Sequence, residues 1–249
     1  MTRRVGAIAV LMASVAGIAS GCDDSSESAD KEPIAESADK EPIEFGVSDL
    51  FIETNATDGD TGLQLNLEGE QWDEIQIRDP EEQALLLDVR GEGELGSLGL
   101  TELFFESNEP PFKKLPSSEF KDRFPEGEYT FTGRTINGRE LVGSDTLSHV
   151  VPDGPVVTNP TEGERVDPKA FTVTWKPVTK PKGVEIARYI VVVTQENPVR
   201  TVEMYLRPDA TSADAPAQFL DPGVETEVEV LAREKSGNQT ITEVQAETK

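Results

Sequence analysis

Cysteine and histidine are almost absent from this chain of 249 residues, which contains one of each. A disulfide needs two cysteines, and zinc sites usually draw several ligands from Cys and His. A catalytic Ser-His-Asp or Cys-His set would have to use His149, and a cysteine nucleophile would have to be Cys22. We therefore expect neither a disulfide framework nor a zinc site, and we expect His149 to be a surface or boundary residue of a strand.

Positive charge is also scarce, with 23 Lys and Arg against 48 Asp and Glu, for a formal net charge of −25. A polyanionic surface repels the phosphates of nucleic acid, so nucleic-acid binding is disfavoured. Such a surface attracts cations or basic partners, and it also resists aggregation. Solubility alone remains an alternative explanation of the charge.

The sequence has no apolar run long enough to span a bilayer, because Val5 to Ala19 falls short of the roughly 20 residues required. The run has the length of a secretory h-region and follows Arg3 and Arg4. It ends in Ala19-Ser20-Gly21-Cys22, which resembles the lipobox of bacterial lipoproteins. The resemblance implies a signal peptide over residues 1–21 and covalent lipid on Cys22. An ordinary signal peptide that contains a cysteine is the alternative.

A lipid at Cys22 would anchor the exported protein to the bacterial cell envelope. Two or more acyl chains hold a protein stably on a bilayer without a spanning helix. We expect the outer membrane or the cell surface, with the inner membrane as an alternative because Asp23 follows the cysteine. The expected partners are the lipid bilayer, through the acyl anchor, and an unidentified envelope protein or polysaccharide.

Residues 22–44 combine the lipid attachment site with an acidic segment that has almost no large apolar side chains. Within it, residues 27–35 are repeated almost unchanged as residues 36–44, and each copy contains a proline. Such a segment cannot bury enough surface to offset its chain entropy. We expect a disordered spacer, which as a flexible coil would span about 26 Å.

Apolar and polar residues alternate beyond the spacer, which is typical of half-buried strands in an antiparallel sheet. Leu63, Leu65 and Leu67 alternate with Gln64 and Asn66. Further runs of the same kind cover residues 75–77, 85–89 and 103–105. These patterns predict a β domain of unassigned family over residues 45–151.

Local signals add detail to this domain. Ser117 or Ser118 can cap a short inserted helix that Pro125 stops, and Asn137-Gly138 predicts a hairpin. Residues 125–129 resemble the turn and tyrosine that lead into a late strand of immunoglobulin-like sandwiches. We therefore expect an immunoglobulin-like β-sandwich with a short helical insertion.

Residues 152–249 carry the segments Phe171 to Pro177, Tyr189 to Val193 and Val228 to Ala232. Their order and spacing resemble a fibronectin type III domain, in which the tryptophan corresponding to Trp175 packs in the core. The family usually places a tyrosine where Thr226 stands, so the corner hydrogen bond is expected to be lost or replaced. The predicted fold class is all-β, with two tandem sandwich-like domains after the spacer.

Asp58 and Asp60 lie in an Asp-Gly-Asp-Thr-Gly stretch and are the weak candidates for a calcium site, because calcium prefers six to eight oxygen ligands. A plain turn is the alternative. Trp72 lies near a strand, where core packing competes with ligand stacking. We identify no catalytic residue and no cofactor other than the lipid at Cys22.

These observations favour a membrane-tethered, non-catalytic lipoprotein that acts as a structural or interaction module. Fibronectin type III units usually serve as spacers or binding platforms, which supports this by analogy only. Two alternatives remain: a carboxylate-based hydrolase with its site in residues 45–151, and a calcium-dependent adhesin.

Overall fold

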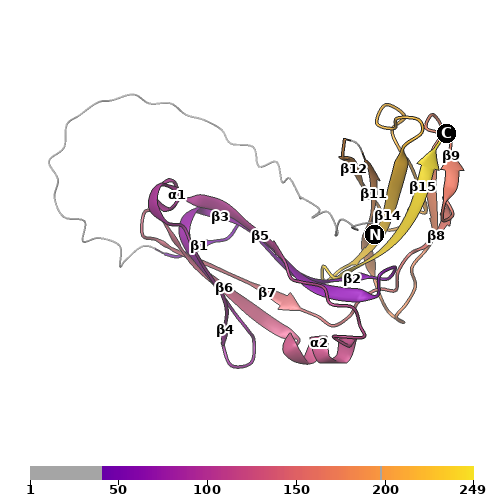
Figure 1. Cartoon of the computed structure of the whole chain (residues 1–249). Coiled ribbons are helices and arrows are strands. Elements are labelled where there is room, and N and C mark those ends of the chain that lie inside the picture. The colour runs from indigo at the N-terminus through magenta and orange to yellow at the C-terminus, as the bar shows by residue number, and fades with distance from the viewer. Residues whose placement is uncertain (1–40, 197) are drawn as a thin grey trace, which may run out of the picture. The chain divides into compact units, whose positions relative to one another are not determined.

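The structure is a computed structural model that describes residues 41–196 and 198–249. In this part of the chain there are fifteen strands and two short helices, so the all-β prediction is confirmed (Figure 1). Neither helix is long and apolar enough to cross a bilayer. Cys22, the signal peptide and most of the acidic spacer lie outside the described residues.

The front unit, residues 43–147, contains seven strands and both helices. Its strands are β1 (Ile43–Glu44), β2 (Val47–Asn55), β3 (Asp60–Arg78), β4 (Leu85–Arg90), β5 (Leu100–Glu106), β6 (Gly127–Thr135) and β7 (Glu140–Leu147). The helices are α1 (Gly93–Leu98) and α2 (Ser117–Arg123).

Strand β3 connects the other strands of the front unit, because different strands pair with its two halves. Its first half pairs with β2 and β5, and its second half pairs with β4 and β6. The register shifts between Glu68 and Trp72, where the strand changes partners. All the strands of the front unit are therefore hydrogen-bonded into one sheet that bends around a common core, rather than into two separate sheets.

The apolar alternation of the sequence correctly identifies this core. Leu63, Leu65 and Leu67 are buried, and Trp72 is buried with them, which confirms core packing for this tryptophan. Gln64 and Asn66, on the opposite face of β3, are also buried. The alternation predicts a polar face there but not that this face is covered.

The predicted hairpin and helix are both present. Gly138 has a φ of 75° in the turn between β6 and β7, a conformation that glycine adopts without steric cost. Helix α2 buries Phe120, which packs against Phe124 with ring centroids 5.0 Å apart. Its N-cap is Pro116 rather than a serine, and no side chain caps it. Proline at this position sets φ near −65° and leads the chain into the helix.

The predicted disordered spacer ends earlier than residue 44. Ile43 and Glu44 form β1, which pairs in parallel with Leu141 and Val142 of β7. Ile43 also packs against the core of the front unit. The apolar contact and the backbone pairing together order a segment whose composition alone predicts disorder.

The C-terminal unit, residues 156–248, folds as a β-sandwich of two layers. One layer has the order β13-β10-β8, and the other has the order β12-β11-β14-β15. The strands are β8 (Val156–Asn159), β9 (Glu164–Val166), β10 (Thr172–Lys176), β11 (Ile186–Gln195), β12 (Arg200–Leu206), β13 (Ser212–Asp214), β14 (Glu225–Glu234) and β15 (Gln239–Thr248).

Trp175 is buried in the core of this sandwich, as the family resemblance implies, and its ring lies 5.4 Å from that of Tyr189. Thr226 is completely buried, and its hydroxyl replaces the missing tyrosine. It donates to the carbonyl oxygen of Val224 at 3.2 Å and accepts from Nε2 of Gln195 at 3.0 Å. The corner hydrogen bond is therefore replaced by a local network.

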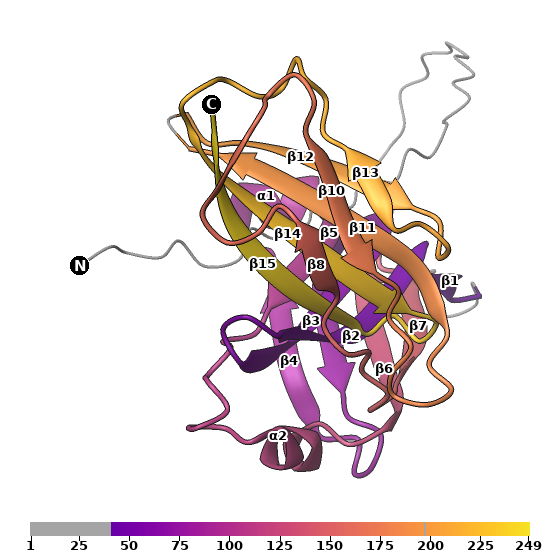
Figure 2. The same cartoon turned by 90° about the vertical axis from the view of Figure 1, so that its right-hand side faces the viewer.

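Strands β2 and β15 join the two units into one continuous sheet (Figures 1 and 2). They pair in parallel, with Gln239 opposite Glu53 and Ile241 opposite Asn55. Each unit keeps its own hydrophobic core. We call this pairing and its side-chain contacts the joint.

Candidate functional site

The joint brings three polar side chains together on one face of the sheet: Glu53 from β2, Gln64 from β3 and Gln239 from β15. Glu53 is only 3% exposed. Its Oε1 accepts a hydrogen bond of 2.6 Å from Nε2 of Gln64, and its Oε2 accepts one from Nε2 of Gln239. Both carboxylate oxygens are thus held by amides from neighbouring strands.

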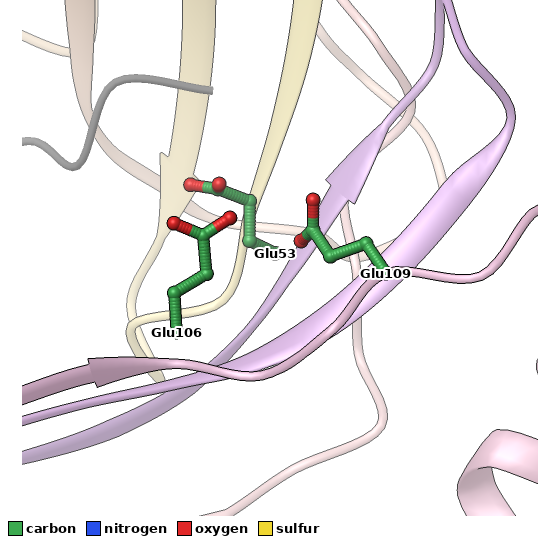
Figure 3. Close-up of side chains that lie close together, drawn as sticks. All are labelled: Glu53, Glu106 and Glu109. Atoms are coloured by element: carbon green, nitrogen blue, oxygen red, sulfur yellow. The ribbon is translucent and has the colours of Figure 1, made fainter. Parts of the chain in front are cut away.

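Two further glutamates lie close to Glu53 (Figure 3). Glu106 ends β5, opposite Gln64, and Glu109 lies in the loop that follows. One oxygen from each of Glu53, Glu106 and Glu109 lies within 4.8 Å of the others. We call these three residues the carboxyl cluster.

Gly62 makes room for the carboxyl cluster. A Cβ atom at this position would lie 2.6 Å from Oε1 of Glu109 and 2.7 Å from its Cγ. Any larger residue at position 62 would therefore push Glu109 away from Glu53. The second glycine of the Asp-Gly-Asp-Thr-Gly stretch therefore leaves space for the carboxyl group of Glu109.

Burial and the negative charge of neighbouring acids raise the pKa values of the three carboxyl groups in the cluster. Burial raises the pKa of Glu53 to about 7, against the opposing hydrogen bond from Gln239. Burial, followed by the negative charge of Glu53, raises the pKa of Glu109 to about 8. The pKa of Glu106 is raised by burial and then by the charge of Asp60. The pKa values of Glu53 and Glu109 are therefore raised to near or above neutral pH, and that of Glu106 is raised in the same direction.

Among the described residues, the cluster is the one group of three or more acids, His or Cys arranged to hold a metal ion. Oε1 of Glu109 is buried without a hydrogen-bond partner, which leaves it available for a proton or a cation. Both oxygens of Glu53 already accept hydrogen bonds from amides, so Glu53 has fewer lone pairs left to bind a metal ion than Glu109 has. The arrangement can store protons, or exchange them for a cation that prefers oxygen ligands.

Of the calcium candidates, Asp58 lies in the turn between β2 and β3, and Asp60 is the first residue of β3, next to the cluster. Oδ1 of Asn55 accepts from the backbone N–H groups of Thr57 and Asp58, and Gly59 has a φ of 72°. The stretch therefore forms a side-chain-supported turn. Burial and then the charge of Asp58 raise the pKa of Asp60, whose own charge acts on Glu106 and Glu109.

The cluster is not predictable from the sequence, because its members carry no local signal. Glu53 and Glu106 occupy polar positions of ordinary strands, and only the register of β2, β3 and β5 places them side by side. The run Leu63, Leu65, Leu67 predicts the strand but not its neighbours. The polar residues Gln64 and Asn66 within that run were the only available hint.

The loop after β14 makes the other half of the joint. Asn238 is completely buried, and its Oδ1 accepts from the N–H of Ile52 at 2.7 Å. Its Nδ2 donates to the carbonyl oxygens of Ser148 and Val150, each at 2.8 Å. This loop of the C-terminal unit therefore contacts β2 and the segment that follows β7.

A second acidic position lies farther along the continuous sheet. Glu229 of β14 is 6% exposed, and burial followed by the charge of Glu227 raises its pKa to about 8. It lies opposite Val192 of β11 and Glu243 of β15. Four buried apolar residues form a separate cluster on these strands: Ile190, Val192, Leu231 and Ile241.

His149 lies just beyond β7 and makes structural contacts. Its ring Nε2 is 2.8 Å from the carbonyl oxygen of Phe124, and its backbone N–H donates to Glu126. This placement agrees with the expected boundary position.

Comparisons with known proteins add two distant structural likenesses. No protein-family model and no curated protein matches the chain. The FN1–FN3 domains of chicken CNTN1 are 12% identical, with a TM-score of 0.30, and the match covers 83% of this chain and 65% of that chain. A segment of two fibronectin type III domains from chicken tenascin is 13% identical, with a TM-score of 0.29, and the match covers 79% of this chain and 96% of that chain.

Proposed function

We propose that this chain is a lipid-anchored, non-catalytic protein of the bacterial cell envelope. Its folded part would serve as a stiff structural or interaction module, with an envelope protein or polysaccharide as partner. The lipobox-like sequence before Cys22 supports the anchor. The all-β fold supports the role of a module, and function still has to be argued from the site rather than from the fold.

The observation that carries the proposal is the continuous sheet across the joint. Tandem domains on a simple linker normally move relative to each other. Here β2 and β15 are paired, and Asn238 is bonded to the N–H of Ile52 in the front unit and to two carbonyl oxygens of the segment that follows β7. Bending at the joint would break these bonds, so the two units should move together as one rigid element.

The anchor and the stiffness need separate tests. Labelled palmitate should be incorporated into the wild-type chain and not into Cys22→Ser, which should leave the membrane fraction. With one spin label in the front unit and one in the C-terminal unit, pulsed EPR should give a single narrow distribution of the distance between the labels. Incorporation that is independent of Cys22 contradicts the anchor, and a broad distance distribution contradicts the stiff module.

A calcium-dependent adhesin is the second candidate, because the carboxyl cluster and Asp60 place several oxygens close together. Calcium would then raise the melting temperature, and Glu109→Gln would remove that rise while Glu225→Gln, at an exposed position, would not. An unchanged melting temperature with calcium would eliminate this candidate. We propose no catalytic role for the cluster, since Glu53 is buried and both its oxygens are held by amides.

A further inference from the structure

Helix α1 exposes apolar side chains instead of burying them. None of its residues is buried, and Leu95 and Leu98 are 51% and 73% exposed. The two leucines are three residues apart, a spacing that places them on the same side of a helix. Figure 1 shows α1 at the end of the front unit that lies away from β15.

The turn between β6 and β7 extends this apolar surface. Ile136 in that turn is 39% exposed. A Cβ atom at Gly99, the residue after α1, would lie only 2.9 Å from Cγ2 of Ile136. The end of the helix and the turn are therefore in contact. We call Leu95, Leu98 and Ile136 the apolar tip.

The chain that comes from Cys22 joins the folded unit beside the apolar tip. Arg139, in the same turn as Ile136, donates from Nη2 to the carbonyl oxygen of Glu41 at 2.9 Å. The next strand, β1, pairs with the start of β7. A flexible coil from residue 22 to residue 41 would span about 24 Å. A lipid at Cys22 would therefore keep this end of the unit close to the bilayer.

We propose that the apolar tip docks on the lipid bilayer, with Leu95, Leu98 and Ile136 entering its interfacial layer. This inference rests on the proposed lipid anchor at Cys22. The tether would raise the effective concentration of the tip at the surface to the millimolar range, so a weak contact is sufficient. Docking would fix the orientation of the stiff module instead of leaving it free on its spacer.

The charges around the apolar tip indicate which lipid headgroups it can approach. Glu92, Glu94 and Glu140 are exposed at this end beside Arg139, and the whole chain carries a formal charge of −25. Anionic lipids would be repelled by such a surface. We therefore assign the tip to a zwitterionic headgroup layer such as that of phosphatidylethanolamine and phosphatidylcholine.

The test uses the acylated full-length protein in vesicles of phosphatidylethanolamine and phosphatidylcholine, with an environment-sensitive NBD dye on Leu98→Cys. We expect a blue shift and about a twofold rise in emission when the protein is in vesicles, because the dye enters the apolar interface. The matched control carries the dye on Val199→Cys, a residue 60% exposed in the C-terminal unit, and should not change. Adding Leu95→Ser and Ile136→Ser should abolish the response at position 98.

Co-flotation with the vesicles separates this proposal from the anchor. Protein that does not float contradicts the anchor and this inference with it. Protein that floats while the dye at position 98 behaves as at position 199 overturns docking and leaves the anchor intact. A dye at position 98 that is already shielded from water without vesicles also overturns docking, because the tip is then covered by protein.

Discussion

Arg233 of β14 donates from Nη2 to both carboxylate oxygens of Asp49 of β2, at 2.8 and 2.6 Å. Its guanidinium also lies over the ring of Phe51, 4.3 Å from the centroid. The side chain of Arg233 is only 6% exposed. A buried cation held by a carboxylate and an aromatic face links the C-terminal unit to the front unit, next to the carboxyl cluster.

Removing the side chain of Asn238 should weaken the joint. Asn238→Ala leaves the N–H of Ile52 and two carbonyl oxygens without their buried partner, and each unmade bond costs about 1–3 kcal/mol. We expect a loss of about 3 kcal/mol in the free energy of unfolding. Urea unfolding measures it, and Gln218→Ala, at an exposed position, is the control.

The two tryptophans can report on each unit separately, since Trp72 lies in the core of the front unit and Trp175 in that of the C-terminal unit. Trp72→Phe leaves Trp175 to report on the C-terminal unit, and Trp175→Phe leaves Trp72 to report on the front unit. With the joint intact, the urea midpoints of these two variants should coincide. The Asn238→Ala change should separate them. Separate midpoints with the joint intact would show that β2 and β15 do not couple the units.

Stability should fall with rising pH because of the carboxyl cluster. A carboxyl group whose folded pKa is raised stabilises the fold below its unfolded pKa, near 4.5, and loses that contribution as pH rises through the folded value. For Glu53 and Glu109 the folded values are about 7 and about 8. The loss should therefore develop between pH 4.5 and 8.

Glu109→Gln isolates this effect, because the amide cannot ionise and Oε1 of Glu109 has no hydrogen-bond partner to lose. The variant's melting temperature relative to wild type should rise steadily from pH 5 to pH 8. Glu225→Gln, at an exposed position, should run parallel to wild type. A difference independent of pH for Glu109→Gln would mean that Glu109 ionises freely in the folded protein.

Tyr129→Phe should cost about 1 kcal/mol of stability, since it removes one buried hydrogen bond. The hydroxyl of Tyr129 donates to the carbonyl oxygen of Pro125 at 3.1 Å, the contact expected of a tyrosine that leads into a late strand. Tyr205→Phe is the control for loss of a hydroxyl at the surface, because Tyr205 is 46% exposed and its hydroxyl donates to Oε2 of Glu203. Equal effects in thermal unfolding would show that the bond to Pro125 contributes nothing.

Thr226→Val should destabilise the C-terminal unit by about 1 kcal/mol, because Nε2 of Gln195 loses one of its two acceptors and keeps the carbonyl oxygen of Asp221, while the shape is otherwise kept. The unfolding signal of Trp175 measures it. Thr211→Val, at an exposed position of the C-terminal unit, serves as a comparison for loss of a hydroxyl at the surface. A neutral Thr226→Val would mean that the missing corner tyrosine has no functional replacement.

The sequence by itself determined the strands and the two cores. Alternation at Leu63, Leu65 and Leu67 and the glycine at position 138 act locally, so side-chain period and turn preference suffice to predict them. Trp175 was placed through its resemblance to a known domain. Helix α1 was not predicted, because its residues neither bury an apolar face nor carry a side-chain cap.

Only the tertiary structure decided how the polar faces are used. Glu53, Glu106 and Gln239 are far apart in the chain, and they meet because β2 pairs with β3 on one side and with β15 on the other. Such pairing depends on long-range register, which no local pattern encodes. The same residues would be ordinary solvated acids and amides on an isolated strand. The neighbouring strands bury them, and the stability of the folded protein then depends on whether the acids are protonated.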